Sequence, residues 1–142
     1  AEEIAEEIFK RKKNGNPVKT TTDLRNVIEE ALSFLPKNNE LKDIIKKTCQ
    51  RVFQALRIDV NSEFEVLYDF LEKLPLVLKP NGRVAILTFH SGEDRLVKKS
   101  FKENVKAGIY SEAAKDVIRP SAEECRCNSR AHSTKLRWAV RS

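Results

Sequence analysis

The stretch that decides the fold is K-P-N-G-R-V-A-I-L-T-F-H-S-G-E-D, residues 79–94. Its first four residues combine proline, asparagine and glycine, which predicts a turn. Residues 83–89 are nearly all apolar, as in a strand that is covered on both faces. The polar residues that follow lead into a helix, for which Ser91 and Asp94 are the expected N-terminal caps.

Helices are expected before this stretch, because apolar residues recur there at helical spacing. One helix is predicted to begin at Thr22 and to close at Pro36, and another to begin at Asn39. Ser62 and Glu65 have the spacing of a capping box, which predicts the start of a third helix. That helix is expected to bury five apolar residues: Phe64, Leu67, Phe70, Leu71 and Leu74.

Two further strands are expected after residue 94. Residues 117–118 suit a short strand, and residues 135–140 alternate polar and apolar side chains, which predicts a half-exposed last strand. A buried strand, a helix and a strand pair in this order are typical of the second half of an open α/β sheet.

The composition sets limits on the class of protein. The chain has 142 residues, 27 Lys+Arg against 21 Asp+Glu and a formal net charge of +6. No apolar run approaches the roughly 20 residues that span a bilayer, and the sequence does not open with a secretory signal. Four isolated glycines exclude a glycine-rich phosphate loop, and the lack of methionine predicts that the chain is a piece of a longer protein.

The positive charge lies in one half of the chain. Residues 1–80 hold 14 basic and 14 acidic side chains, whereas residues 81–142 hold 13 basic and 7 acidic ones. A surplus of this kind indicates a polyanionic partner such as nucleic acid, with an ordinary solvated surface as the alternative.

The three cysteines predict reduced thiols and an intracellular protein, because their number is odd and their spacing suits no disulfide framework. Cys125, Cys127 and His132 do not have the spacing of a common zinc site, so no metal is expected.

The end of the predicted buried strand is the first candidate site, because ligands of open α/β sheets collect beyond the carboxyl ends of the strands. His90 is a candidate general base or hydrogen-bond donor, and Phe89 a stacking surface. In the alternative interpretation, residues 90–94 only cap the following helix. Ser91 lacks the glycine-flanked turn of a hydrolytic nucleophile, so a catalytic triad is not expected.

The second candidate site is the tail, residues 128–138, which mixes basic, hydroxyl and aromatic side chains. That mixture suits phosphate contacts beside a stacking surface. The alternative is an edge strand that its charges protect from pairing with other chains.

Several separated segments resemble one family. Residues 51–63 read R-V-F-Q-A-L-R-I-D-V-N-S-E, residues 79–83 read K-P-N-G-R, and residues 88–98 read T-F-H-S-G-E-D-R-L-V-K. Residues 120–124 and 128–137 follow in the same order, as P-S-A-E-E and N-S-R-A-H-S-T-K-L-R. Together they resemble the motifs of the MraW (RsmH) family of S-adenosylmethionine-dependent methyltransferases, which act on a cytidine of small-subunit ribosomal RNA.

The resemblance implies an α/β fold, the C-terminal half of a Rossmann-like class I methyltransferase sheet preceded by helices from the end of a helical substrate-recognition insert. Residues 1–50 would be the end of the insert and its junction helix, and residues 51–142 the half-sheet. The family's glycine-rich loop for S-adenosylmethionine lies upstream, so no cofactor-binding residue is expected here and the isolated segment is expected to be inactive.

The resemblance further implies residues that face the substrate. His90 and Ser91 are the expected catalytic residues. The expected RNA-binding residues are Arg57, Asn61, Phe89, Arg130, Ser133, Lys135 and Arg137.

Some positions depart from the family pattern: Gly92 replaces a leucine, which should loosen the first helical turn, Ser129 replaces a proline and His132 an arginine. These departures suggest a diverged member, in the cytoplasm or, if eukaryotic, in an organelle. A non-catalytic RNA-binding or ribosome-assembly module, derived from the same fold, is the alternative function, and a plain protein-interaction domain is a third. No membrane partner is expected, and the apolar edge of the strand over residues 83–89 suggests a homodimer.

Overall fold

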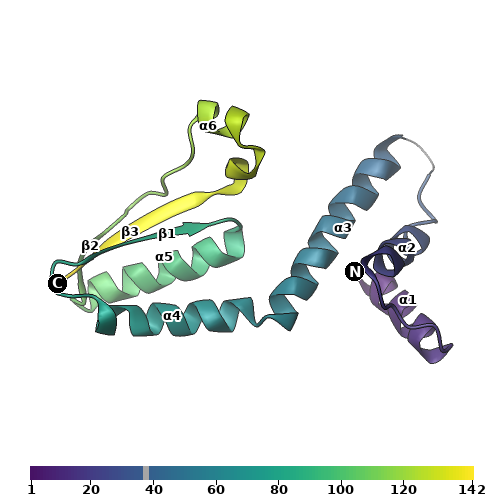
Figure 1. The fold of residues 1–142 in the computed structure, drawn as a ribbon, viewed down its shortest axis with the longest axis horizontal. Helices are drawn as coiled ribbons and strands as arrows, with labels where there is room; N and C mark the ends of the chain where they lie inside the picture. The colour runs from purple at the N-terminus through teal and green to yellow at the C-terminus, as the bar shows by residue number, and fades with distance from the viewer. Residues whose placement is uncertain (37–38) are drawn as a thin grey trace. The chain divides into compact units, whose positions relative to one another are not determined.

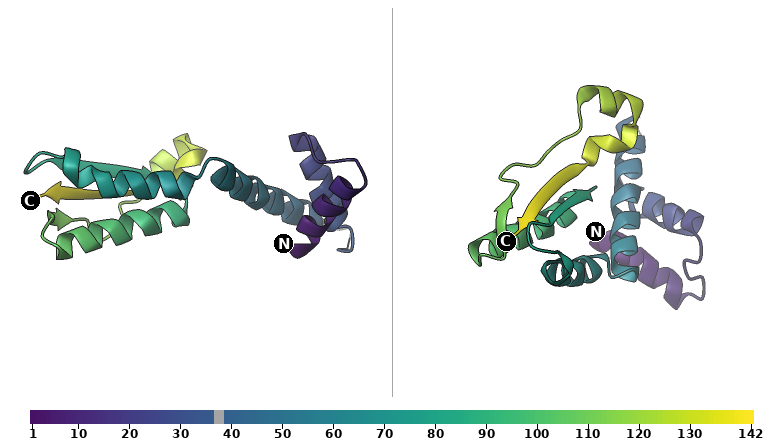
Figure 2. Two further views of the ribbon diagram at one scale, coloured as in Figure 1. Left: turned by 90° about the horizontal axis from the view of Figure 1, so that it is seen from below. Right: turned by 60° about the vertical axis from the view of Figure 1, so that its left-hand side comes forward.

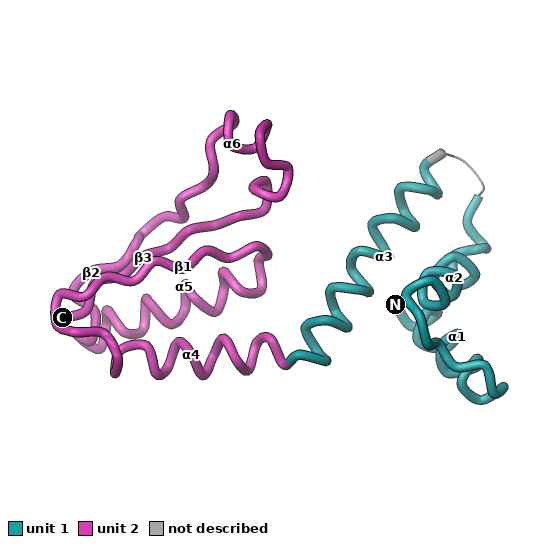
Figure 3. Tube along the Cα trace, in the orientation of Figure 1, with its two compact units in different colours: residues 1–61 teal, residues 62–142 magenta. Residues whose placement is uncertain are grey.

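The computed structural model describes residues 1–36 and 39–142, which form two compact units, 1–61 and 62–142 (Figure 3). The expected family boundary after residue 50 falls inside a continuous helix and stays a prediction about domains, whereas the compact units divide after Asn61. Among the described residues, no helix has the length and apolar character needed to cross a membrane.

The first unit consists of three helices, α1 (Glu2–Lys13), α2 (Thr21–Ala31) and α3 (Asn39–Val60). Their shared core is formed by Ile4, Leu24, Val27, Ile28 and Leu32. Helix α2 begins earlier than expected: Thr20, not Thr22, is its N-cap. Thr20 Oγ1 accepts from the Asp23 backbone N–H at 3.1 Å, and the Asp23 carboxylate accepts from the Thr20 N–H at 2.9 Å, so the pair satisfies two end amides.

The second unit is a small mixed α/β fold (Figure 1). Its elements are α4 (Glu63–Val77), β1 (Arg83–Thr88), α5 (Ser91–Lys106), β2 (Tyr110–Ala113), α6 (Ala122–Cys127), the 3₁₀ helix η1 (Ser129–Ser133) and β3 (Lys135–Arg141). The strands form a sheet in the order β1-β3-β2, in which β3 is antiparallel to both neighbours. β1 and β2 are therefore parallel to each other, with α5 as the connection between them.

The helices cover one face of this sheet. Helix α5 packs against all three strands and α4 packs against α5, as the views in Figures 1 and 2 show. The buried core between these layers consists of Leu71, Leu74, Val97, Phe101, Tyr110 and Ala139. Its centre is an edge-to-face contact between the rings of Phe101 and Tyr110, whose centroids are 5.7 Å apart.

The turn before β1 is confirmed. Gly82 N–H donates to the Lys79 carbonyl at 2.8 Å, and Asn81 adopts a left-handed conformation with φ 62°. Proline at the second position and a left-handed asparagine at the third define a type II turn. In place of the short strand expected over residues 117–118, the structure has a single antiparallel bridge from Ile118 to Leu136.

Two expectations for α4 are wrong. Ser62 does not cap the helix with its side chain: its backbone is left-handed (φ 48°), whereas a capping residue normally has an extended backbone. Phe70 is about half exposed (49 %), whereas Leu71 and Leu74 are buried, because only the face of α4 toward α5 finds apolar partners.

Burial of β1 on both faces is not found among the described residues. Val84 and Ile86 lie on the helix-covered face of the sheet, whereas Leu87 lies on the opposite face and is 52 % exposed. β1 is also an edge strand, as the expected homodimer requires, but nothing else in the described chain supports a dimer.

The last strand is confirmed. In a half-exposed strand the apolar side chains would ordinarily face the core, but here the larger ones face away from it. The charged Arg137 is buried toward the helices, whereas Leu136 and Trp138 lie on the open face. The reason is Asp94 in the first turn of α5, which accepts from Arg137 Nε at 2.7 Å and from Arg137 Nη2 at 3.3 Å. Lys135 Nζ lies 3.5 Å from the same carboxylate.

This ion pair sets the ionisation of Asp94. Burial by itself would raise the pKa of the carboxyl, but the hydrogen bonds from Arg137 and the charges of Arg137 and Lys135 outweigh burial and lower the pKa below its ordinary value. Asp94 is therefore an anion in the folded protein, and it holds the start of α5 against β3.

We predict that Asp94→Asn destabilises the protein by about 3–5 kcal/mol, because it leaves Arg137 buried without a counter-charge. Urea unfolding measures the loss. Asp69→Asn is the matched control, because Asp69 pairs with Lys73 on the surface at 3.1 Å, with both side chains more than half exposed. The control should change stability by less than about 1 kcal/mol. A loss of similar size in both variants would contradict the role given to Asp94.

The same pair predicts the acid sensitivity of the fold. Since the folded-state pKa of Asp94 is lowered, its stabilisation is complete above the pKa of the unfolded chain and disappears as pH falls through the folded-state pKa. Unfolding free energy measured between about pH 6 and pH 2 should fall less steeply in Asp94→Asn than in the unmodified chain. Parallel curves would show that Asp94 does not contribute.

Candidate functional site

The carboxyl end of β1 is the candidate site, and its first residue is fixed by the sheet. Thr88 is buried, and its Oγ1 donates to the Lys135 carbonyl at 3.2 Å across the β1–β3 pair. Phe89, one residue further on, is 54 % exposed. Its backbone N–H donates to the Glu93 carboxylate at 2.9 Å, so the main chain is held while the ring stays accessible.

His90, not Ser91 or Asp94, caps helix α5. Its Nδ1 accepts from the backbone N–H groups of Gly92 at 3.2 Å and Glu93 at 3.4 Å. The Glu93 carboxylate in turn accepts from the His90 N–H, which completes a capping box with an imidazole in the place usually taken by a hydroxyl. Ser91 is exposed and is the first residue of the helix.

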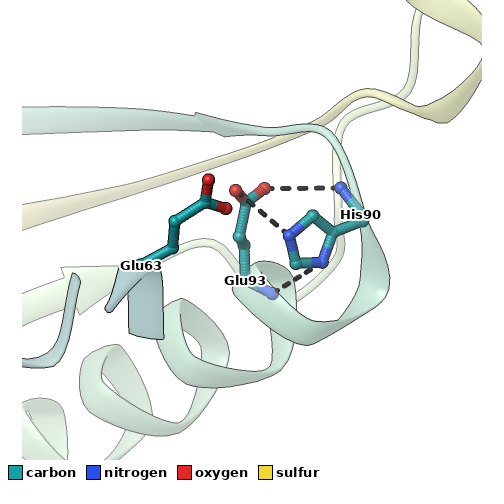
Figure 4. A group of neighbouring side chains, drawn as sticks. All are labelled: Glu63, His90 and Glu93. Atoms are coloured by element: carbon teal, nitrogen blue, oxygen red, sulfur yellow. Dashed lines mark hydrogen bonds and ion pairs between the residues drawn. The ribbon is translucent and has the colours of Figure 1, made fainter. Parts of the chain in front are cut away.

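The capping hydrogen bonds determine which nitrogen of His90 carries the proton. Because Nδ1 accepts, the neutral ring carries its hydrogen on Nε2. Nε2 is buried and lies 3.2 Å from the Glu93 carboxylate, without the alignment of a hydrogen bond. Glu63, from the start of α4, approaches the same side of the ring (Figure 4).

Glu63, His90 and Glu93 bring their ligand-type atoms within 4.8 Å of one another, but the arrangement does not suit a metal ion. A metal on Nε2 would require the proton on Nδ1, where it would face two backbone N–H donors. Metal-bound histidines normally show the opposite pattern and donate from their second nitrogen. Cys125, Cys127 and His132 do not gather into such a cluster among the described residues.

Gly92 lies against the ring of Phe64. A Cβ at position 92 would lie 2.8 Å from Phe64 Cζ and 3.1 Å from His90 Nδ1. The rings of Phe64 and His90 are themselves in edge-to-face contact at 5.8 Å. The missing side chain therefore leaves room for Phe64 to pack on the first turn of α5, and this contact offsets the expected loosening of that turn.

The basic residues of the tail divide into two groups. Lys135 and Arg137 are turned inward to Asp94, with side chains only 15 % and 7 % exposed, so they help to hold α5 against β3, and their expected contact with RNA stays a prediction. Arg130 and Ser133, in η1, are exposed. The sequence predicts Asp94 as a cap and gives no direct sign of its partner. The one signal is a charged residue, Arg137, in the middle of a strand.

Arg57 and Asn61 belong to the first compact unit. Both are exposed, and the Asn61 side-chain amide donates to the Arg57 carbonyl at 2.8 Å, which closes the end of α3. Their expected contact with RNA stays a prediction.

Two of the expected residues, Phe89 and Arg130, line one cavity of about 270 Å³. The cavity is lined by residues of α6 and η1 and by residues at the end of β1 and the start of β3, and its wall also contains Glu124 and Asn128, which the sequence analysis did not single out. The structure thus joins the strand end and the exposed part of the tail into a single site.

Two parallel strands connected by a helix, with an antiparallel strand between them, define this part of the chain as a mixed α/β protein whose candidate site lies at the carboxyl end of a strand. The model of the MraW methylase family matches residues 1–142, and the chain belongs to this family.

Curated relatives cover the same residues. The chain is 67 % identical over 141 residues to a protein of Agathobacter rectalis named ribosomal RNA small subunit methyltransferase H 1. The matched region covers 99 % of this chain and 40 % of that protein. A protein of Lachnoclostridium phytofermentans with the same name is 66 % identical over all 142 residues, 38 % of its length. A protein of Alkaliphilus metalliredigens named ribosomal RNA small subunit methyltransferase H 2 is 59 % identical over 98 % of this chain and 40 % of its own length.

The chain thus spans about 40 % of the length of these relatives. All three are bacterial, so they lend no support to an organellar or eukaryotic origin.

We predict that His90→Ala destabilises the fold by about 1 kcal/mol, the usual loss when a helix cap is removed. His90→Asn should recover most of that loss, because an asparagine oxygen accepts the same backbone N–H groups. Thermal unfolding of both variants measures the difference. Equal stability of the two variants would show that His90 does not act as a cap.

Proposed function

We propose that this chain is the substrate-binding part of an S-adenosylmethionine-dependent methyltransferase that methylates N4 of a cytosine in small-subunit ribosomal RNA. The observation that carries the proposal is the family match over every residue of the chain, joined to relatives that are named for small-subunit ribosomal RNA. We further propose an intracellular location, where such a substrate is found.

The sheet supports a place within a larger Rossmann-like domain. β1 and β2 are parallel and joined by α5, while β3 lies between them in the opposite direction. Large doubly wound sheets commonly carry an antiparallel strand near one edge. In such sheets the carboxyl ends of the parallel strands face the ligand, and this is where Phe89 lies.

The proposed reaction depends mainly on positioning. The exocyclic amine of cytosine is a weak nucleophile because its lone pair is conjugated with the ring. An enzyme must therefore take the base out of its stack and hold the amine in line with the methyl group. An exposed aromatic ring beside basic and amide side chains is the kind of surface that holds such a base.

The residues described here do not fit S-adenosylmethionine. Nothing lies close to Gly15 or Gly108. The backbone of Lys79, in the same turn, lies against Gly82, and the ring of Phe64 lies against Gly92. Only Gly92 follows a strand and lies at the start of a helix, and it is a single glycine, not part of the glycine-rich loop that holds a cofactor. We assign no step of the reaction to the cofactor, and propose that its binding residues belong to the part of the family that this chain does not cover.

A catalytic role of His90 is proposed separately from its role as a cap. In the full-length protein, His90→Asn would keep the cap while removing the imidazole. Loss of turnover in this variant, at unchanged stability, would support a chemical role for the ring. Retained turnover would leave His90 as a positioning residue that fixes the start of α5 and thereby Phe89.

A non-catalytic RNA-binding module is the second candidate, because basic residues outnumber acidic ones in the second half of the chain. An assay of methyl transfer by the full-length protein distinguishes the enzyme from the binding module. Only the enzyme would transfer a radiolabelled methyl group from S-adenosylmethionine to ribosomal RNA.

We predict that the 142-residue chain binds single-stranded RNA with a strong salt dependence and does not bind S-adenosylmethionine. Arg130→Ala should lower the slope of log K against log [salt] by about 0.7, the value for one phosphate contact on a single strand. Fluorescence anisotropy over a salt series measures the slope.

Lys73→Ala is the control, because Lys73 lies on α4 and pairs with Asp69 away from the basic tail. RNA binding that does not respond to salt, or an equal change in both variants, would count against the proposed RNA surface.

A further inference from the structure

The cavity at the end of β1 has a wall of two kinds. One part is apolar, formed by Leu87, Ile118 and Leu136 on the open face of the sheet. The other part is polar: Glu124, Asn128 and Arg130 come from α6, η1 and the residue between them, and Arg119 and Thr134 complete it. Phe89 adds an aromatic ring that is 54 % exposed.

The charged side chains of this wall are not used by the fold. Among the residues that the structure describes, the Glu124 carboxylate and the Arg130 guanidinium make no hydrogen bond or ion pair. Asn128 Oδ1 accepts from the Arg130 backbone N–H at 3.1 Å, so its amide NH₂ stays available as a donor. The wall therefore presents one strong acceptor, Glu124, beside the donors of Arg119, Asn128 and Arg130.

The volume limits the size of the ligand. At about 270 Å³ the cavity lies just below the range of ordinary small-molecule sites, and so suits one ring and not a pair of stacked bases. An apolar floor, an exposed aromatic ring and unpaired polar groups are the features that hold a single unstacked base.

We propose that this cavity binds one unstacked pyrimidine and that Glu124 selects cytosine over uracil; this rests on the proposed function. The amine of cytosine donates, and its ring nitrogen and carbonyl accept. A carboxylate is the natural partner of that amine, and the donors of Asn128 and Arg130 suit the two acceptors. Uracil presents a carbonyl oxygen where cytosine has the amine, which would face the Glu124 carboxylate and be repelled.

The test measures binding of cytidine 5′-monophosphate and uridine 5′-monophosphate to the full-length protein by NMR titration. The unmodified protein should prefer the cytidine nucleotide by about tenfold, the effect of one good polar contact to a base edge. Glu124→Gln should reduce this preference to less than about threefold, because an amide offers both a donor and an acceptor. Phe89→Ala should weaken both nucleotides by a similar factor, about tenfold, through loss of stacking.

Glu123→Gln is the matched control, because Glu123 is the neighbouring exposed carboxylate on α6 and does not line the cavity. It should keep the full preference. Unchanged preference in Glu124→Gln, or an equal drop in the Glu123 control, would overturn the assignment of Glu124. Binding of neither nucleotide at millimolar concentration would overturn the cavity as a base site.

Methyl incorporation into ribosomal RNA by the same preparations separates this inference from the proposed function. Incorporation with an unchanged nucleotide preference in Glu124→Gln would refute the pocket and leave the methyltransferase proposal standing. Absence of incorporation by the unmodified protein would refute the methyltransferase proposal, while a preference lost in Glu124→Gln would still support the base pocket.

Discussion

The buried pair between Asp94 and Arg137 determines how the second unit is arranged. Arg137 would ordinarily turn to solvent from a strand that alternates polar and apolar residues. A carboxylate 2.7 Å away in the first turn of α5 reverses this, because a buried guanidinium is tolerated only beside a counter-charge. Strand β3 is therefore oriented with its charged side toward the helices.

The orientation of β3 has a consequence for the opposite face of the sheet. Once Arg137 and Ala139 point toward α5, Leu136 and Trp138 must point away from it, because side chains alternate along a strand. Leu136 then lies opposite Leu87 on β1, and together with Ile118 they form the apolar part of the cavity at the strand end. The ion pair on one face and the candidate ligand site on the other thus follow from one choice of register.

Local signals were sufficient to predict most elements, and long-range pairing explains what they missed. The turn before β1, the strand itself and the last strand were predictable because turn chemistry and apolar runs are properties of neighbouring residues. The caps at Thr20 and His90 were displaced by one or two positions, since several residue types can accept from the same amides. Which face of β3 is buried, and where β2 pairs, depend on residues far apart in the chain.

In the candidate site, Phe89 and Arg130 were predictable from the sequence. Glu124 and Asn128 were not, because only the fold brings α6 close to the end of β1.

The same structure changes the meaning of the net charge. The surplus of basic residues lies after residue 80, and this surplus suggested a surface for a polyanion. Two of those cations, Lys135 and Arg137, are directed inward at the single carboxylate of Asp94. Fewer cations are thus open to a nucleic acid than the sequence suggests, and the exposed ones include Arg119 and Arg130 beside the cavity at the end of β1. Exposed cations attract an RNA backbone whatever its sequence, and the small pocket of matched polar groups beside Arg130 adds recognition of one base to that attraction.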